Sequence, residues 1–138
     1  MSKAEPQIQK FMTCQPHAIE ASESVEVAAK MLVDLQIRHL PVMAGDKIVG
    51  VLSDRDIKTA MSLISANPVK LSVRDICHEH AYEVSPTALL HDVVLEMASK
   101  KIGSAIVVQN GKLVGIFTTV DVCRALASIL DQRFHSHW

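Results

Sequence analysis

Aromatic side chains and long apolar stretches are scarce in this chain, and both shortages restrict its class. Only 4% of the 138 residues are aromatic, although 49% are hydrophobic. The core must therefore consist mainly of aliphatic side chains and alanine. The apolar runs are only a few residues long, which argues against a membrane-spanning helix. The start of the chain lacks the apolar stretch of a secretory signal, so we expect a cytoplasmic protein.

Charge, cysteine and glycine are also limited, and each shortage argues against a class of function. The formal net charge is −1 and no long basic run occurs, so general nucleic-acid binding is not expected. The cysteines Cys14, Cys77 and Cys123 are odd in number and widely separated, which fits reduced thiols. The five glycines match neither a dinucleotide-binding fingerprint nor a phosphate-binding loop. No motif predicts catalysis, and we expect that the protein is not an enzyme.

An internal repeat is the main feature of what is present. The stretch Gly50–Asp56 contains a glycine, two apolar residues, a hydroxyl side chain and a final aspartate, and Gly115–Asp121 repeats this order 65 positions later without a gap. Periodicity around both stretches predicts a strand, a helix, a two-stranded hairpin and a second helix in each copy. We place the first copy at residues 8–64, a linker at 65–72, the second copy at 73–130 and a C-terminal tail at 131–138.

Local signals define several elements of these copies. Apolar residues recur at helical spacing over Val25–Leu35, which predicts a helix there. Asn110-Gly111 is typical of a two-residue hairpin turn. We expect the last helix to run from Thr119 to about Leu130.

The end of each repeated stretch carries side chains suited to an anionic ligand. Ser53 and Thr118 stand where a strand passes into a helix, and the free N–H groups and positive dipole end of a helix stabilise a phosphate. Asp56 and Asp121 follow on the next turn of the same helix face, and Arg55 adds a planar cation suited to phosphate oxygens. A simpler interpretation stays open, in which the hydroxyls and aspartates only cap the helices and Arg55 is a solvated surface charge.

The two copies resemble the CBS (cystathionine β-synthase) domain, as a tandem pair or Bateman module. The residues that carry the resemblance are Arg38–Val42 with Gly50–Asp56 in the first copy, and Ile102–Val108 with Gly115–Asp121 in the second. The likeness covers roughly residues 8–130. It implies an α+β, sandwich-like fold in which two βαββα repeats pack with pseudo-twofold symmetry through their sheets.

The resemblance also implies a function. We expect a stand-alone regulatory module that binds AMP, ADP, ATP or S-adenosylmethionine in clefts between the copies, with no other cofactor required. It would form homodimers and control a separate enzyme or transporter. The aspartates would accept hydrogen bonds from ribose, and adenine would lie against the backbone of the hairpin strands. The expected ligand-binding residues are Arg38, His39, Leu40, Pro41, Ser53, Arg55, Asp56, Ser104, Ala105, Ile106, Thr118 and Asp121.

The two expected sites differ in charge. The second copy has Thr119-Val120 where the first has Asp54-Arg55, so we expect it to lack its own guanidinium. The side with Arg55 would then favour a phosphorylated nucleotide. The other would hold adenosine or S-adenosylmethionine, borrow a cation or stay empty.

Two further functions stay open. The chain could be a constitutive interaction module whose clefts are vestigial. It could also be a metal- or redox-linked regulator that uses Cys77-His78-Glu79-His80, with His135 and His137 of the tail as further ligands. Because Cys77 occupies an apolar position of the repeat, we assign no metal ligands.

Overall fold

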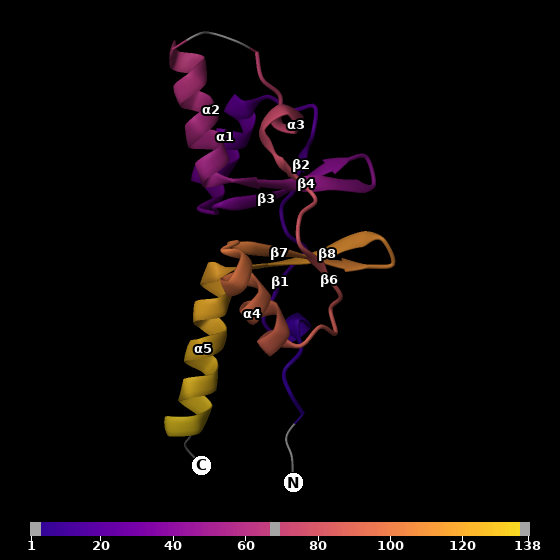
Figure 1. The fold of residues 1–138 in the computed structure, drawn as a ribbon, viewed down its shortest axis with the longest axis vertical. Helices are drawn as coiled ribbons and strands as arrows, with labels where there is room; N and C mark the ends of the chain where they lie inside the picture. The colour runs from indigo at the N-terminus through magenta and orange to yellow at the C-terminus, as the bar shows by residue number, and fades with distance from the viewer. Residues whose placement is uncertain (1–3, 67–69, 136–138) are drawn as a thin grey trace. The chain divides into compact units, whose positions relative to one another are not determined.

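Two units, each built around its own sheet, divide the chain (Figure 1). The computed structural model describes residues 4–66 and 70–135. Pro16–Ala81 form one unit, called here the central unit, and Met1–Gln15 with Tyr82–Trp138 form the other, called the terminal unit. Each unit combines helices with a four-stranded mixed sheet, which confirms the expected α+β class.

The central unit has the strand order β2-β3-β4-β5. Strand β2 is parallel to β3, whereas the pairs β3–β4 and β4–β5 are antiparallel. Its core joins aliphatic side chains of the strands, such as Leu40 and Leu52, to the inner faces of α1 and α2. Its elements are β2 Ile19–Glu20, α1 Val25–Leu35, β3 His39–Ala44, β4 Lys47–Ser53, α2 Asp54–Ala66, α3 Val73–Ile76 and β5 His78–Glu79.

The terminal unit repeats this plan with the order β6-β7-β8-β1. Strand β6 is parallel to β7, and β7–β8 and β8–β1 are antiparallel. Its core contains Phe117 together with aliphatic residues of α4 and α5. Its elements are η1 Ile8–Lys10, β1 Thr13–Cys14, β6 Glu83–Val84, α4 Leu90–Lys100, β7 Ser104–Gln109, β8 Lys112–Thr118 and α5 Thr119–Phe134.

The local signals in the sequence account for several boundaries. Helix α1 begins after Ser24, whose Oγ accepts from the N–H of Val27 at 3.2 Å. The hairpin β7–β8 turns at Asn110 and Gly111, whose φ angles of 54° and 75° match the predicted turn. Helix α5 ends at Phe134, one turn beyond the expected end, because the chain contains no helix-breaking glycine or proline after Leu130.

A short crossing strand completes each sheet, and the repeat did not predict it. Strand β5 pairs with β4 and β1 pairs with β8, at positions separated by 65 residues in the two units. Consequently the segment before the first copy's strand belongs to the terminal unit, and residues 73–79 belong to the central unit. The compact units and the boundaries of the sequence repeat therefore do not coincide.

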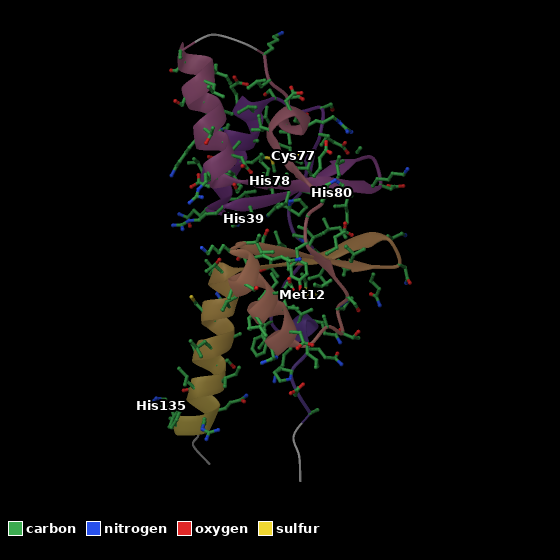
Figure 2. The ribbon with its side chains drawn as sticks, in the orientation of Figure 1. Met12, His39, Cys77, His78, His80 and His135 are labelled. Carbon is green, nitrogen blue, oxygen red and sulfur yellow. The ribbon has the colours of Figure 1, made fainter. Side chains whose placement is uncertain are left out.

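Glycine at two positions permits these crossings. A Cβ at Gly50 would lie 2.9 Å from the carbonyl carbon of His78, with Cys77 Sγ at 3.4 Å. A Cβ at Gly115 would lie 2.5 Å from Met12 Sδ. Met12 and Cys77 stand at equivalent positions of the repeat, one in each unit (Figure 2). Because these two positions have no Cβ, each crossing strand can pack closely against the strand that carries the glycine.

Candidate functional site

In the central unit, Ser53 and Asp56 form a reciprocal cap at the start of α2. The N–H of Ser53 donates to Asp56 Oδ2 at 2.9 Å, and the N–H of Asp56 donates to Ser53 Oγ at 3.2 Å. This is a capping box, and it holds the carboxylate beside the first turn of the helix. The Asp56 side chain is only 13% exposed, so burial and the two hydrogen bonds together fix its orientation.

In the terminal unit, Thr118 and Asp121 form the same arrangement at the start of α5. The N–H of Thr118 donates to Asp121 Oδ2 at 2.9 Å, and the Thr118 hydroxyl lies 3.4 Å from the same oxygen. Asp121 is buried, at 4% exposure. The capping role that the sequence left open is therefore present in both units, and it orients two carboxylates in the same way.

The crossing strands bring a third side chain to each carboxylate. His78 Nε2 of β5 lies 3.0 Å from Asp56 Oδ1, and Figure 2 shows His78 beside the sheet of the central unit. In the terminal unit the hydroxyl of Thr13, on β1, donates to Asp121 Oδ1 at 3.2 Å. Thr13 and His78 were not predicted as site residues. Their position 65 residues apart was the available signal.

The positions of the arginines differ from the expectation that only the first copy has a guanidinium near its aspartate. Arg124 Nη1 lies 3.7 Å from Asp121 Oδ1, so the expectation that the second copy lacks its own guanidinium was wrong. The cation lies one turn later on α5 than on α2. Val120 is at the position equivalent to Arg55, and Arg124 is at the position equivalent to Thr59. Arg55 is exposed, and it takes part in none of the ion pairs formed within residues 4–66 and 70–135.

The residues expected to surround adenine lie on the first strand of each hairpin. In the central unit, Leu40 and Pro41 are buried on β3 and His39 is half-buried at its start. Burial lowers the pKa of the His39 imidazole, an effect that Asp56 partly opposes. In the terminal unit the equivalent residues Ser104, Ala105 and Ile106 are all buried on β7. Of these side chains, only those of Leu40 and Ala105 belong to the hydrophobic cores of the two units.

The residues before these strands tie the hairpin to the helix that carries the aspartate. The carbonyl of Arg38 accepts from the N–H of Asp54 at 2.8 Å, and that of Gly103 accepts from the N–H of Thr119 at 3.2 Å. Arg38 and Gly103 are equivalent positions of the repeat. The Arg38 backbone is thereby engaged in the fold, and the residue is exposed.

Comparison with known proteins identifies the family. The model of the CBS domain matches residues 8–63 and 73–128, which together form most of the chain. The chain belongs to the CBS domain family. A crystal structure of CBSX2 in complex with AMP is 31% identical, aligns with a TM-score of 0.75, and the match covers 89% of this chain and 97% of that one.

Other relatives with CBS domains are more distant or much longer. One solved structure is that of the CBS domain pair of protein MJ0100 in complex with 5′-methylthioadenosine and S-adenosyl-L-methionine. It is 23% identical to this chain, and the match covers 91% of this chain and 99% of that one. Its TM-score of 0.81 supports the fold. Inosine-5′-monophosphate dehydrogenase from Korarchaeum cryptofilum is 30% identical over 123 residues, which cover 88% of this chain and 25% of that enzyme. The chain spans 35% or less of the first three curated relatives it matches.

The Cys77–His80 segment does not form a metal centre within the described part of the chain. No group of three or more histidine, cysteine or acidic side chains there is arranged to hold a metal ion. Instead His78 contacts Asp56, and Glu79 pairs with Gly50 in the sheet. Burial raises the pKa of the Cys77 thiol, which keeps it protonated at neutral pH. His137 lies outside the described residues.

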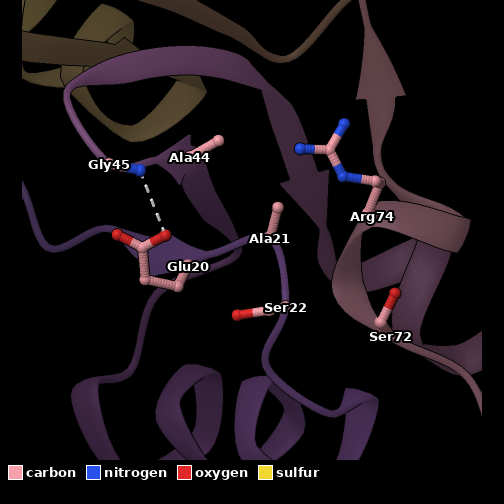
Figure 3. A pocket seen from close by; sticks show the side chains of 7 residues that line it. All are labelled: Glu20, Ala21, Ser22, Ala44, Gly45, Ser72 and Arg74. Carbon is pink, nitrogen blue, oxygen red and sulfur yellow. Dashed lines mark hydrogen bonds between the residues drawn. The ribbon is translucent and has the colours of Figure 1, made fainter.

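One pocket of this CBS domain protein lies away from all the predicted residues (Figure 3). It belongs to the central unit and has a volume of about 560 Å³. The Glu20 carboxylate there accepts from the N–H of Gly45 at 3.3 Å, which anchors the β3–β4 turn. That turn is at the far end of β4 from Ser53. The pocket is lined by Glu20, Ala21, Ser22, Ala44, Gly45, Ser72 and Arg74.

In the residues that the structure describes, no helix has the length and apolar composition needed to cross a membrane.

Proposed function

We propose that this CBS domain protein is a cytoplasmic regulatory module that binds an adenosine-containing ligand and controls a separate protein. The observation that carries the proposal is the duplicated cap, in which Asp56 and Asp121 are each fixed beside a helix start. An ionised carboxylate can accept both hydrogen bonds of a ribose diol, and its fixed orientation lowers the entropic cost of binding. The complex of AMP with CBSX2, at 31% identity over nearly all of that chain, supports the ligand class.

Each part of the ligand has a proposed contact in this account. The ribose hydroxyls donate to Asp56 or Asp121. The phosphate lies near the hydroxyl and N–H groups at the start of α2 or α5, where the helix dipole is positive. Adenine lies against the backbone of β3 or β7.

The side with Asp56 is the better candidate for a phosphorylated ligand. Arg55 is adjacent to the cap and has no ion-pair partner in the described chain, so its guanidinium is available to phosphate oxygens. Arg124 is within ion-pair distance of Asp121, and its side chain is largely exposed. Since Arg124 is already paired with the carboxylate of Asp121, its guanidinium is less available to a phosphate than that of Arg55, and we propose that the terminal side binds adenosine or S-adenosylmethionine in preference to AMP.

Ligand-dependent stabilisation tests the proposed function. A ligand that binds the native state at 100 times its Kd stabilises it by about 2.7 kcal/mol. AMP, ADP, ATP and S-adenosylmethionine are each added to the purified protein, and the shift of Tm is measured. At least one should raise Tm, Asp56→Asn and Asp121→Asn should each reduce the shift, and the double variant should abolish it.

Asp92→Asn is the matched control, since Asp92 is also paired with a histidine but lies on α4 with 69% of its side chain exposed. It should leave the ligand-induced shift unchanged. Absence of any shift with all four compounds would favour a constitutive interaction module.

We further propose that the protein forms a homodimer through α5. Three exposed apolar side chains of this helix, Leu126, Leu130 and Phe134, recur every four residues and so lie on one face. A second copy of the same stripe would cover them. Sedimentation analysis should show a dimer, and Leu126→Glu with Leu130→Glu should shift it to a monomer without changing the helix content.

A further inference from the structure

The two aspartates differ in the side chain that the crossing strand presents to them. Asp56 is paired with the imidazole of His78, with 3.0 Å between Nε2 and Oδ1. Asp121 receives the neutral hydroxyl of Thr13 at 3.2 Å. His78 and Thr13 occupy equivalent positions of β5 and β1, where each pairs with the strand that ends at the cap. This is a chemical difference at equivalent positions of the two crossing strands, in addition to the different placement of Arg55 and Arg124.

The difference affects how many acceptor positions remain for a ribose. A carboxylate has about four lone-pair sites. Asp56 uses Oδ2 for the N–H of Ser53 and Oδ1 for His78. A threonine hydroxyl can rotate its hydrogen to a different acceptor, whereas a protonated imidazole holds a charge-assisted bond to the carboxylate. His78 therefore competes with ribose more strongly when it is charged, and Thr13 does not change with pH.

We propose that residue 78 sets the ribose affinity of the Asp56 side, so that this side binds adenosine ligands more weakly as the pH falls, while the Asp121 side does not. The inference rests on the proposed function, because it concerns the same ligand. His78 is a positioning residue that acts through Asp56. Among side chains, only histidine has an unperturbed charge change between about pH 5 and about pH 8, which sets the range for the test.

The effects of other charged groups near this pair must be distinguished from the effect of His78. His39 is acted on electrostatically by Asp56, Arg38 and Asp54. Cys77, next to His78 on the β5 side, is acted on by Glu79, Arg74 and Asp56. Among them His39 is the other histidine. Its burial disfavours the charged form, so the effect of pH on binding should survive His39→Gln.

Calorimetric titration with adenosine tests the proposal, because adenosine has no phosphate that titrates in this range. The Asp121→Asn variant reports the Asp56 side alone. Its affinity should fall about two- to fivefold between about pH 8 and about pH 5, the range expected for a partly exposed ion pair. Adding His78→Thr, which installs the residue of the other unit, should remove the dependence. His78→Gln should do the same if the threonine variant does not fold.

Two further variants complete the test. Thr13→His in the Asp56→Asn protein should create a pH dependence on the Asp121 side. His91→Thr, which removes a histidine paired with Asp92 at 3.2 Å on α4, should change nothing. If adenosine binds but its pH profile is the same with and without His78, the inference is overturned and the proposed function stands. If adenosine fails to bind the wild-type protein even at about pH 8, the inference is overturned, and the proposed function is overturned with it only if AMP, ADP, ATP and S-adenosylmethionine also fail to bind.

Discussion

Replacing Gly50 by alanine should destabilise the central unit more than the same change at Gly115 destabilises the terminal unit. At Gly50 the added methyl would meet the backbone of the crossing strand, with the carbonyl carbon of His78 at 2.9 Å and its oxygen closer still. Backbone held in a sheet cannot move without losing its pairing. At Gly115 the nearest atom is Met12 Sδ at 2.5 Å, and a flexible thioether can turn away.

The magnitudes follow from these neighbours. Overpacking against fixed atoms costs about 1–3 kcal/mol. We expect Gly50→Ala at the upper end of that range, because β5 must leave β4 to relieve the clash. Gly115→Ala should be at the lower end. Since β5 carries His78, Gly50→Ala should also separate the imidazole from Asp56.

Urea unfolding monitored by circular dichroism measures both costs, with the free energy of unfolding taken by linear extrapolation. A lower midpoint with an unchanged slope would indicate a true loss of native stability. If Gly115→Ala proved as destabilising as Gly50→Ala, or if neither change had an effect, the argument that the crossing strands require these glycines would be refuted.

Two other changes test the electrostatics of the site. Because burial lowers the pKa of His39 in the native state, the unfolded chain binds a proton more readily, so the stability that neutral His39 contributes is present above about pH 6.5 and is lost as pH falls. His39→Gln should therefore flatten the acid limb of a Tm-versus-pH curve, and an unchanged limb would contradict this. Arg55→Gln should weaken AMP binding about tenfold, the effect of losing a charged hydrogen bond to phosphate, while leaving adenosine binding unchanged. Equal losses for the two ligands would show that the guanidinium does not contact the phosphate.

Much of the fold could be predicted because local chemistry determines it. The gap-free shift between Gly50–Asp56 and Gly115–Asp121 predicted two equivalent sheets. The hairpin turn at Asn110-Gly111 followed from the need for positive φ at both residues. The hydroxyl residues before α2 and α5 were correctly placed at helix starts.

The crossing strands could not be predicted in the same way. Strands β1 and β5 have only two residues each, too few for a periodic pattern. Which sheet they join depends on tertiary packing, in which distant segments meet. The glycines indicated that some backbone must come close, but they did not identify it. For that reason Thr13 and His78 were missed as partners of the aspartates.

The position of the cations was missed for a related reason. The comparison of Arg55 with Val120 was made at one position of the repeat, whereas a helix brings residues three apart to the same face. Arg124 therefore reaches Asp121 from the next turn. Comparing helix faces, instead of single aligned positions, would have found it.

The most direct test of the central claim is the dependence of binding on the ribose hydroxyls. Calorimetry would compare AMP with 2′,3′-dideoxy-AMP on the wild-type protein, because only the diol distinguishes the two ligands. If the carboxylates of Asp56 and Asp121 accept those hydroxyls, the dideoxy compound should bind at least about tenfold more weakly, as expected for the loss of charged hydrogen bonds. Equal affinities would contradict the account.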